Sequence, residues 1–464
     1  MAKNISVSQE MLLSEYFDNN FWEALMEQRW TLKIENFAKI GNAEIELSPF
    51  ICFLGDNNSG KSYLMSLLWG LLTLGKDIFP KKKTEAKSYL ICEEWLKASL
   101  NKETVIYEDV FEIYLKWFNE LLSSNKKELV KKIFNYEVNI DKIEICDYRR
   151  KSLILKWGED GARYSSSKKY IQFPKANDPG REDLLRMNIY ICWNLIMDGI
   201  AAPLYTPVVK GRRTGEPIYF PASRTGFMLT YSQLLESAIQ SSFSKLHDNE
   251  NSVLTLPYID FLQLITKFES RDKCNFEELV AFAEENMISG KINVRNEYTP
   301  EIKYIPDGAG RELPLFASSS VVSEISPLLL TLKSNINFKT VIIEEPEAHL
   351  HPALQKQMAR FLLKLMNKGI PVWITTHSDT ILQHFNNMIK LYNSKNKEVL
   401  CEEYSYSEND LLNPDNAVMY QFEKKGRNKT DVVKLTCNSN GFVVPTFNDA
   451  LTSLLDEVYA FQED

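Results

Sequence analysis

The apolar and polar positions of the first 75 residues follow two different periods. Residues 9–29 have apolar positions at helical spacing and predict a helical extension over residues 1–30. The segment "TLKIENFAKIGNAEIEL" (31–47) alternates in two short runs, and Gly41-Asn42 between them predicts a hairpin turn. The apolar run "FICFL" (50–54) predicts a buried strand, and "SYLMSLLWGLLTLG" (62–75) predicts an apolar helix that ends near Gly75. Residues 31–75 therefore indicate the first part of an α/β core.

The segment between residues 76 and 216 has a different pattern. Charged amphipathic stretches predict helices, for example "DVFEIYLKWFNELLSSNKKELVKKIFN" and a long helix over 183–200. Only "KIEIC" and "SLILKWG" have strand character, and we expect them as a pair. We interpret 76–216 as a mostly helical insertion. Its heptad pattern never lasts three or four repeats, so a long coiled-coil arm is not predicted.

The core pattern returns at residue 217. A strand and turn, "PIYFPASRTGF" (217–227), precede a helical stretch over 229–300 and a small-residue turn that leads into a helix within 313–332. Apolar strands are predicted at 340–344 and 370–378, with a helix at 353–367 between them. We therefore treat 217–400 as the second part of the core. Residues 401–464 form a C-terminal segment of short strands ("AVMYQFE", "DVVKLT", "GFVVPTF") with an acidic helix over 448–463.

Composition and charge narrow the classes of function. The chain has 464 residues, of which 44% are hydrophobic and 25% charged, as is typical of folded proteins. Its net charge of −8 provides no overall positive field for nucleic acid or acidic membranes. The seven cysteines are scattered without a C-x-x-C pair, which favours reduced thiols in the cytosol. With no signal-peptide pattern and no apolar run near the ~18 residues that span a bilayer, we expect a cytoplasmic protein without a membrane partner.

The sequence "GDNNSGKS" fits the phosphate-binding pattern G-x-x-x-x-G-K-[ST], with an apolar strand before it and a helix after it. Glycines let successive backbone N–H groups turn inward toward an anion, and the helix start directs its dipole to the same place. Lys61 is expected to reach the β- and γ-phosphates of a nucleotide, and the Ser62 hydroxyl to bind Mg²⁺. A Gly/Asn turn with an accidental lysine is the alternative that this context disfavours. The predicted binding residues are Gly55, Asp56, Asn57, Asn58, Ser59, Gly60, Lys61 and Ser62.

Two adjacent carboxylates follow the apolar strand in "VIIEEPEAHLHP" (341–352). A nucleotide-hydrolysing site needs an acidic strand end that orients Mg²⁺ and the attacking water. We expect Glu344 to hold the metal, directly or through water, and Glu345 to be the general base. Glutamate at the first position is a departure, because most proteins with this phosphate-binding pattern have aspartate there. The alternative is an exposed acidic turn without chemistry.

Three histidines lie close to these strand ends. His377 follows the apolar strand in "VWITTHSD" and is expected to contact the γ-phosphate or the attacking water. His349 and His351 have an H-x-H spacing that can bind a metal, but Pro352 predicts a helix start directly after them. We therefore do not expect zinc there. We interpret this connection as a loop near the nucleotide and a partner subunit, where Glu347 and His349 assist.

With "GDNNSGKS", "VIIEEPEAHLHP" and "ITTHSD" in this order, the chain resembles the ABC-type ATPases that include SMC proteins, double-strand-break-repair ATPases and OLD-family ATPases. It is most similar to the OLD-like AAA family ATPases of bacteria, over residues 31–75 and 217–464. "YFPASRTGF" and "GFVVPTFNDAL" add to this resemblance. It implies a P-loop NTPase fold with an ABC-type ATPase head, and ATP and Mg²⁺ as cofactors.

The resemblance also implies that heads work as a homo-oligomer, a dimer or larger, with ATP at the subunit interfaces. The segment "ASSSVVSE" would then place Ser318, Ser319 and Ser320 against the ATP of the partner subunit, although the family often has glycine in this loop. A capped helix start without a ligand is the alternative. Arg224 matches an arginine common in the family. A role near the nucleotide or in coupling between subunits stays open beside a structural salt bridge.

OLD nucleases carry a C-terminal nuclease domain, and the residues after position 400 are too few for one. In this respect the chain is similar to the stand-alone ATPase subunits of anti-phage systems such as Septu and PARIS. The resemblance implies an ATP-dependent switch that controls a separate effector protein, a nuclease or a toxin. A DNA repair or recombination ATPase that clamps DNA is the alternative, weakened by the acidic composition and the lack of long arms. A transporter-type subunit fits less well because of the long insertion from 76 to 216.

Overall fold

The computed structural model describes residues 29–82, 84–149, 152–165, 170–197, 216–244, 254–269, 274–296, 300–334, 336, 338–426, 428–444 and 455–461. The helical extension predicted over residues 1–30 lies outside this part, except that Arg29 begins a strand. The first half of the acidic helix predicted over 448–463 also lies outside it, whereas residues 455–461 are helical. Among the described helices, none is long and apolar enough to cross a membrane.

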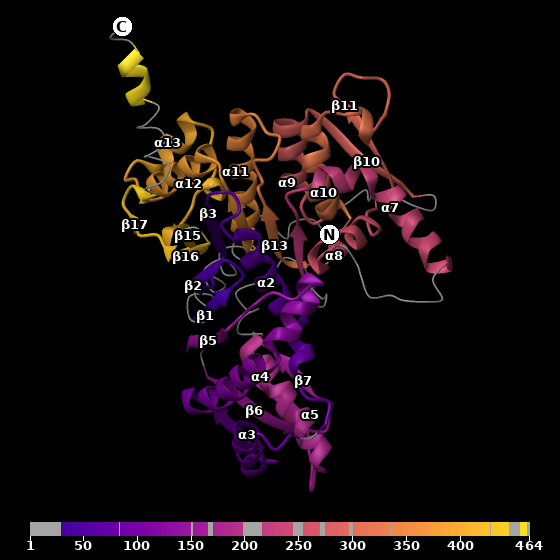
Figure 1. The fold of residues 1–464 in the computed structure, drawn as a ribbon, viewed down its shortest axis with the longest axis vertical. Coiled ribbons are helices and arrows are strands. Elements are labelled where there is room, and N and C mark those ends of the chain that lie inside the picture. Colours follow the sequence, from indigo (N-terminus) through magenta and orange to yellow (C-terminus); the bar gives the residue numbers. More distant parts are fainter. Residues whose placement is uncertain are drawn as a thin grey trace, which may run out of the picture.

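A sheet of nine strands forms the centre of the molecule, in the order β5-β1-β2-β16-β15-β3-β14-β13-β9 (Figure 1). The five strands from β15 to β9 are parallel to one another, and β1 pairs antiparallel with both β2 and β5. This mixture confirms the predicted α/β class. The strands are β1 (Arg29–Phe37), β2 (Ile40–Glu46), β3 (Phe50–Gly55), β5 (Lys142–Arg149), β9 (Glu216–Phe220), β13 (Phe338–Glu344), β14 (Val372–Thr376), β15 (Ala417–Lys425) and β16 (Lys429–Lys434).

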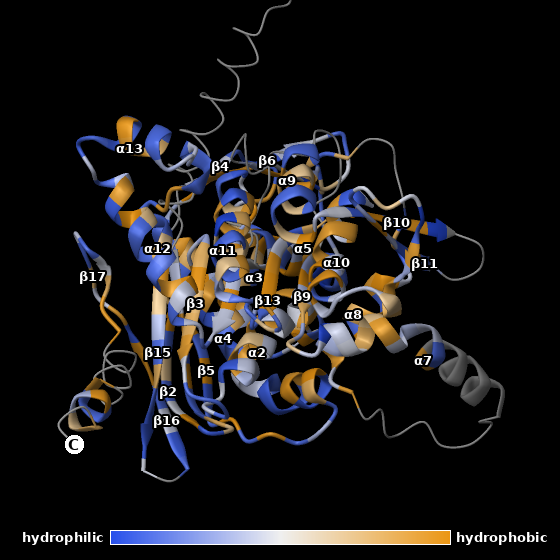
Figure 2. Cartoon of the chain, turned by 90° about the horizontal axis from the view of Figure 1, so that it is seen from above, coloured by the Kyte–Doolittle hydropathy of each residue, from blue (hydrophilic) through white to orange (hydrophobic). Residues whose placement is uncertain are grey.

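Helices cover both faces of the parallel half, because its strands are apolar on both sides. In β3, Ile51 and Phe53 join a core with the helix α2 (Lys61–Leu74). Cys52 and Leu54 point to the opposite face. There they pack in a second core with α10 (Ser320–Lys333), α11 (Pro352–Asn367) and α12 (Asp379–Tyr392). Apolar residues accordingly gather between the sheet and its helices (Figure 2).

The insertion forms the lower end of the molecule in Figure 1. It contains α3 (Lys87–Ala98), α4 (Glu108–Phe134) and α5 (Arg181–Cys192), which continues as a π-helical turn to Met197. A four-stranded sheet lies beside them, in the order β4 (Thr104–Ile106), β6 (Leu153–Gly158), β8 (Tyr170–Pro174) and β7 (Arg163–Ser165). The expected pairing of "KIEIC" with "SLILKWG" is wrong. The first is β5, which pairs with β1 in the central sheet, and the second is β6.

Two further local predictions are wrong. The turn between β1 and β2 is at Ala38 and Lys39, and Gly41-Asn42 lies inside β2. Within the helical stretch expected over 229–300, the helices end before a hairpin of β10 (Gly290–Asn296) and β11 (Pro300–Pro306), which β12 (Leu313–Pro314) extends. Both strands of this hairpin alternate buried and exposed positions. The helices in this stretch are α7 (Arg224–Ser244), α8 (Leu256–Ile265) and α9 (Glu277–Ala283), which continues as a π-helical turn to Ile288.

The strands expected in the C-terminal segment belong largely to the central sheet. β15 pairs in parallel with β3, and β16 joins β15 to β2, so the end of the chain closes the gap between the two halves of the sheet. The helix α13 (Lys397–Glu403) precedes them. The short strands β17 (Cys437–Asn438) and β18 (Gly441–Phe442) form a separate pair.

The close contact of α2 with α4 depends on Gly70. A Cβ at this position would lie 2.1 Å from Cδ1 of the buried Ile133. We expect Gly70→Ala to lower the thermal midpoint of unfolding, because overpacking costs about 1–3 kcal/mol and outweighs the gain of about 1 kcal/mol in helix propensity. Gly226→Ala in α7 is the matched control, since no atom lies within 4 Å of the added Cβ. A midpoint that rises in both variants would contradict the close packing.

Candidate functional site

Three parallel strands bring the predicted residues to one edge of the sheet. β14 lies between β3 and β13, with Thr376 beside Leu54 and Thr375 beside Glu344. Each strand therefore ends at nearly the same level. The loop that begins at Gly55, the residue His377 and the residue Glu345 all follow at this edge. Ligands of open parallel sheets bind at this carboxyl edge.

The loop from Gly55 to Gly60 has the backbone of an anion cradle. Gly55, Asn58 and Gly60 have φ angles of 138°, 60° and 105°, in the left-handed region that favours glycine and asparagine. A Cβ on Gly55 would also lie 2.9 Å from the carbonyl oxygen of Phe422 in β15. The helix α2 begins at Lys61 with no side-chain cap and no acidic residue in its first turn. Its first N–H groups are therefore available to an anion.

The Lys61 side chain is held inside this loop. Its Nζ donates to the carbonyl oxygens of Gly55 and Asp56, both at 2.8 Å, and lies 3.4 Å from Oγ of Ser59. Burial lowers the pKa of Lys61 to about 8, although the carboxylates of Glu345 and Asp56 oppose this shift. A buried ammonium that has only carbonyl and hydroxyl partners is well suited to bind a phosphate.

A cavity of about 420 Å³ connects the loop with the other two strand ends. Of the predicted residues, it is lined by the loop from Asn57 to Ser62, by Glu345 and by His377. The lining does not include Gly55, Asp56 or Glu344. The structure thus gathers most of the predicted nucleotide-binding and catalytic side chains around one space.

Glu345 and His377 face each other at this cavity. His377 Nε2 lies 3.5 Å from Glu345 Oε1. The hydrogen bond with His377 holds the pKa of Glu345 below its ordinary value, so its carboxylate is ionised at neutral pH, as a general base must be. Glu345 has a left-handed backbone (φ 44°), and its N–H donates to the carbonyl of Thr375 at 2.9 Å.

Glu347 positions the backbone of His377, which faces Glu345. The backbone N–H of His377 donates to Glu347 Oε1 at 2.6 Å. Burial raises the pKa of Glu347 above its ordinary value. This bond ties the start of the β13–α11 connection to the end of β14, and the assisting role expected for Glu347 stays a prediction.

Glu344 points away from the cavity. It is buried, and its carboxylate accepts hydrogen bonds from the Tyr219 hydroxyl at 2.6 Å and from the Ala222 N–H at 3.1 Å. Ser62 and Glu345 are among the lining side chains that offer hard oxygen atoms to the cavity. Such donors, together with phosphate oxygens, fit Mg²⁺. The metal-binding role of Glu344 stays a prediction.

Arg224, whose role the sequence left open, makes several buried contacts. It is fully buried and forms an ion pair with Glu324 of α10. Its Nη1 also donates to the carbonyl of Glu344 at 2.6 Å, and its Nη2 to that of Glu345 at 3.1 Å. The structure therefore shows the structural salt bridge, and the same guanidinium joins α10 to the strand end that carries the two glutamates.

The serines at the start of α10 lie apart from this cavity. Ser319 and Ser320 are exposed, Ser319 caps the helix by accepting from the Val322 N–H at 3.4 Å, and Ser318 donates to the Leu315 carbonyl at 2.6 Å. None of the three lines the cavity of its own chain. Their contact with a partner's nucleotide stays a prediction.

His349 and His351 are exposed residues of the β13–α11 connection. His351 Nδ1 accepts from the Ala353 N–H at 3.4 Å at the start of α11, and His349 has a φ of 59°. Over the described part of the chain, no group of three or more His, Cys, Asp or Glu residues is arranged to hold a metal ion. His351 therefore has a local role as a helix cap.

Sequence reasoning missed Lys424 at the end of β15. Its Nζ lies 2.7 Å from the Asp56 carboxylate, and this hydrogen bond lowers the pKa of Asp56. No local pattern could reveal this contact, because it depends on the parallel pairing of β15 with β3. The ion pair ties the C-terminal strand to the phosphate-binding loop.

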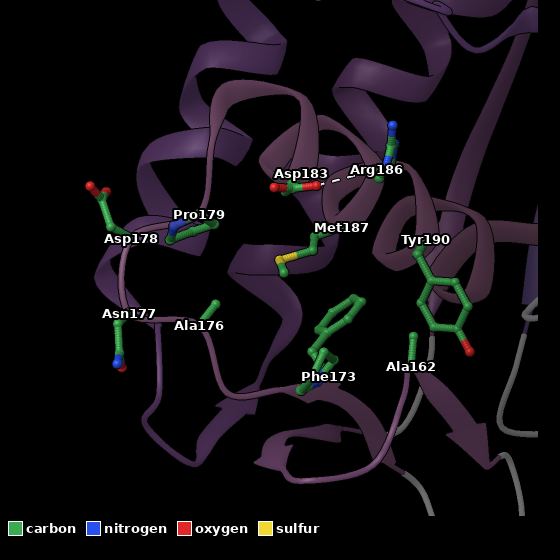
Figure 3. A pocket seen from close by; sticks show the side chains of 11 residues that line it. Ala162, Phe173, Ala176, Asn177, Asp178, Pro179, Asp183, Arg186, Met187 and Tyr190 are labelled. Carbon is green, nitrogen blue, oxygen red and sulfur yellow. Dashed lines mark ion pairs between the residues drawn. The ribbon is translucent and has the colours of Figure 1, made fainter.

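A second cavity, of about 490 Å³, lies in the insertion between α5 and the end of β8 (Figure 3). Phe173, Met187 and Tyr190 form much of its wall, and Arg186 on its rim pairs with Asp183 at 3.8 Å. It contains none of the predicted site residues. An apolar wall with a neutralised arginine does not suit a polyphosphate, so the cavity beside Lys61 is the candidate nucleotide site.

Comparison with known proteins agrees with this geometry. A family model described as "AAA ATPase domain" matches residues 31–188 and 222–382, which is more than half of the chain. The matched residues include the phosphate-binding loop, Arg224, Glu344, Glu345 and His377. Together with the strand–loop–helix geometry, this match confirms the predicted P-loop ATPase fold. No curated protein matches the chain.

Similar solved structures include three SMC heads. They are an Smc head bound to the C-winged helix domain of ScpA, an Smc head with an extended coiled coil bound to the C-terminal domain of ScpA from Pyrococcus furiosus, and the SMC head domain from Thermotoga maritima. They are 13%, 14% and 11% identical to this chain, of which they cover 88%, 92% and 88%. The alignments span 97%, 98% and 98% of those chains, with TM-scores of 0.33, 0.32 and 0.33. TM-scores this low support no argument, so the family assignment rests on the matched family model.

The buried ion pair of Arg224 generates a stability prediction. Arg224→Ala leaves the Glu324 carboxylate buried without its cation, and we expect the free energy of unfolding to fall by about 3–5 kcal/mol. The double variant Arg224→Met, Glu324→Leu removes both charges and should lose less. Denaturant unfolding measures both. If the double variant is as unstable as Arg224→Ala, the loss of stability comes from the carbonyls of Glu344 and Glu345, which lose their hydrogen bonds to Arg224 in both variants.

The pKa of Lys61 generates a prediction for ligand affinity. Because the pKa is about 8 in the folded protein, the ammonium loses its proton above this pH and attracts phosphate less. We expect ATP affinity to be constant below pH 8 and to fall by up to about tenfold per pH unit above it. In the absence of ligand the sign for stability is opposite: the cost of burying the ammonium is present below pH 8 and disappears toward 10.5.

Titration calorimetry between pH 7 and 9.5 measures this dependence. Lys61→Arg is the control, because its guanidinium stays protonated and any remaining affinity should not depend on pH. Wild-type affinity that stays constant to pH 9.5 would contradict the prediction.

Proposed function

The chain belongs to the AAA ATPase domain family, and from that premise we propose that it binds ATP with Mg²⁺ and hydrolyses ATP to ADP and phosphate. One observation supports this proposal most: Lys61, Ser62, Glu345 and His377 line a single cavity at the carboxyl edge of the sheet. An ammonium for the phosphates, a hydroxyl for Mg²⁺ and a residue that orients the attacking water are the groups that recur in nucleotide hydrolysis.

Each group has a distinct part in the proposed reaction. Lys61 and the first N–H groups of α2 bind the phosphates and stabilise the negative charge on them. Ser62 would hold Mg²⁺, with Glu344 expected to assist directly or through water, and the bound ion would polarise the phosphate oxygens. Glu345 accepts the proton of the attacking water, and His377 holds that carboxylate and the water in position.

We further propose that two heads close over ATP. Ser319 and Ser320 are exposed at the start of α10 and Ser318 before them is half-buried, all outside their own cavity, where a partner's phosphate can reach them. Phe316, two residues before Ser318, is 77% exposed, and such an aromatic side chain is a common anchor of a protein interface. Arg224 links this helix with Glu345, so closure of the dimer would be coupled to hydrolysis.

The output of this cycle is proposed to be control of a separate effector protein, a nuclease or a toxin, in anti-phage defence. The resemblance to stand-alone defence ATPases supports this role, as does the acidic net charge of −8, which does not favour a DNA clamp. The ATPase rate with and without double-stranded DNA separates the two functions. Strong stimulation by DNA with salt-sensitive binding would contradict the effector role and favour repair.

Two substitutions test the catalytic assignments. Glu345→Gln keeps the shape of the side chain but cannot accept the proton, so we expect ATP binding with kcat reduced by about 10²–10⁴-fold. The same variant should accumulate as the closed oligomer in native mass measurements with ATP. Lys61→Ala should abolish ATP binding.

His351→Ala is the control, since this exposed residue lies on the same connection as Glu345 and caps α11. It should retain the wild-type ATPase rate. A Glu345→Gln variant that hydrolyses ATP at the wild-type rate would place the base elsewhere, and tight ATP binding by Lys61→Ala would refute the cradle.

A further inference from the structure

The cavity beside Lys61 extends beyond the groups that bind phosphate. Its far side is lined by Tyr63 of α2, by Tyr136 and Asn139, and by Ala38 and Lys39 of the β1–β2 turn. Tyr136 and Asn139 belong to the connection between α4 and β5, at the end of the insertion that is nearest to the central sheet. Phosphate and metal binding leave this side of the cavity without a role.

Aromatic rings form this side of the cavity. The ring of Tyr63 stacks on that of Phe134, with centroids 5.0 Å apart and planes at 18°, and both contact the buried Phe37. Tyr63 is 36% exposed and Tyr136 58% exposed, so both keep free surface beside the cavity. Exposed aromatic side chains that line a cavity are suited to stack on a planar base.

The connection that carries Tyr136 is fixed to β1 and to the turn after it. The Ala38 N–H donates to the Asn139 carbonyl at 3.2 Å, and the Asp141 N–H to the Glu35 carbonyl at 3.1 Å. The side chain of Asn139 donates to the Asn36 carbonyl at 3.0 Å, and that of Asn36 to Asp141 at 2.8 Å. Four hydrogen bonds therefore hold this lining in place before a ligand arrives.

We propose that this side of the cavity is a base subsite, in which Tyr136 and Tyr63 stack on the purine ring of the nucleotide and Asn139 meets its polar edge. This inference rests on the proposed ATP binding and deepens it. The amide nitrogen of Asn139 already donates to Asn36, which leaves its oxygen as an acceptor. An acceptor matches the exocyclic amino group of adenine better than the oxygen at the same position of guanine.

The subsite gives the insertion a direct contact with the nucleotide. The helix α4 ends at Phe134, two residues before Tyr136, and runs through the insertion for 27 residues. A base held against Tyr136 would therefore lie at the end of this helix.

Binding of ATP and of inorganic tripolyphosphate to Tyr136→Ala tests the subsite, because tripolyphosphate has the phosphates but no base. We expect Tyr136→Ala to weaken ATP binding about tenfold, as the loss of one base–aromatic stack predicts. Tripolyphosphate should bind this variant as it binds the wild type, and Tyr136→Phe should restore ATP affinity. Tyr107→Ala is the matched control. This tyrosine is 61% exposed at the other end of α4, about 40 Å away along the helix, and should affect neither ligand.

Each other outcome counts against the subsite. An equal loss of affinity for both ligands would show that Tyr136 supports the phosphate-binding loop, and unchanged ATP affinity would show that it does not touch the base. Wild-type protein that binds ATP no more tightly than tripolyphosphate would also refute the subsite while leaving the phosphate cradle intact. Wild-type protein that binds neither ligand would refute the proposed ATP binding itself, and the subsite with it.

Discussion

The parallel pairing of β14 with β3 on one side and with β13 on the other is the constraint on which the site depends. It sets Thr376 beside Leu54 and Thr375 beside Glu344, so the phosphate-binding loop, His377 and Glu345 leave the sheet at one level. All three strands are buried on both faces, which fixes their register, because a slip of one residue would exchange the faces of every side chain. Apolar packing of the three strands thus positions the reactive side chains of the site.

Charged side chains from distant segments then fix the backbone at this edge. Arg224 binds the carbonyls of Glu344 and Glu345, Glu347 accepts from the His377 N–H, and Lys424 pairs with Asp56 of the loop. Arg224 is fully buried, and a buried charge is stable only when it is paired, so its contacts are strongly specified. They hold the reactive groups in place before a ligand arrives, which is how an enzyme avoids reorganising its site during the reaction. They also connect that edge to α10 and to β15.

The sequence was sufficient where structure is local and insufficient where pairing is distant. The strand, loop and helix around Lys61 were predictable because glycine positions and apolar periods encode them within a few residues. No local pattern identifies the partner of a strand. The sequence therefore could not predict the parallel pairing of β15 with β3, the entry of β5 into the central sheet or the contact of Tyr136 with the cavity. The orientation of Glu344 toward Tyr219 belongs to the same class, because it depends on β9 lying next to β13.

A crystal structure of the Glu345→Gln variant with ATP and Mg²⁺ tests most directly whether these strand ends form one nucleotide site. We expect the triphosphate in the cavity between the loop and His377, with Lys61 Nζ moved from the carbonyls of Gly55 and Asp56 to the phosphates. ATP bound at another place on the head, or Lys61 still on those two carbonyls beside an ordered nucleotide, would contradict the site described above.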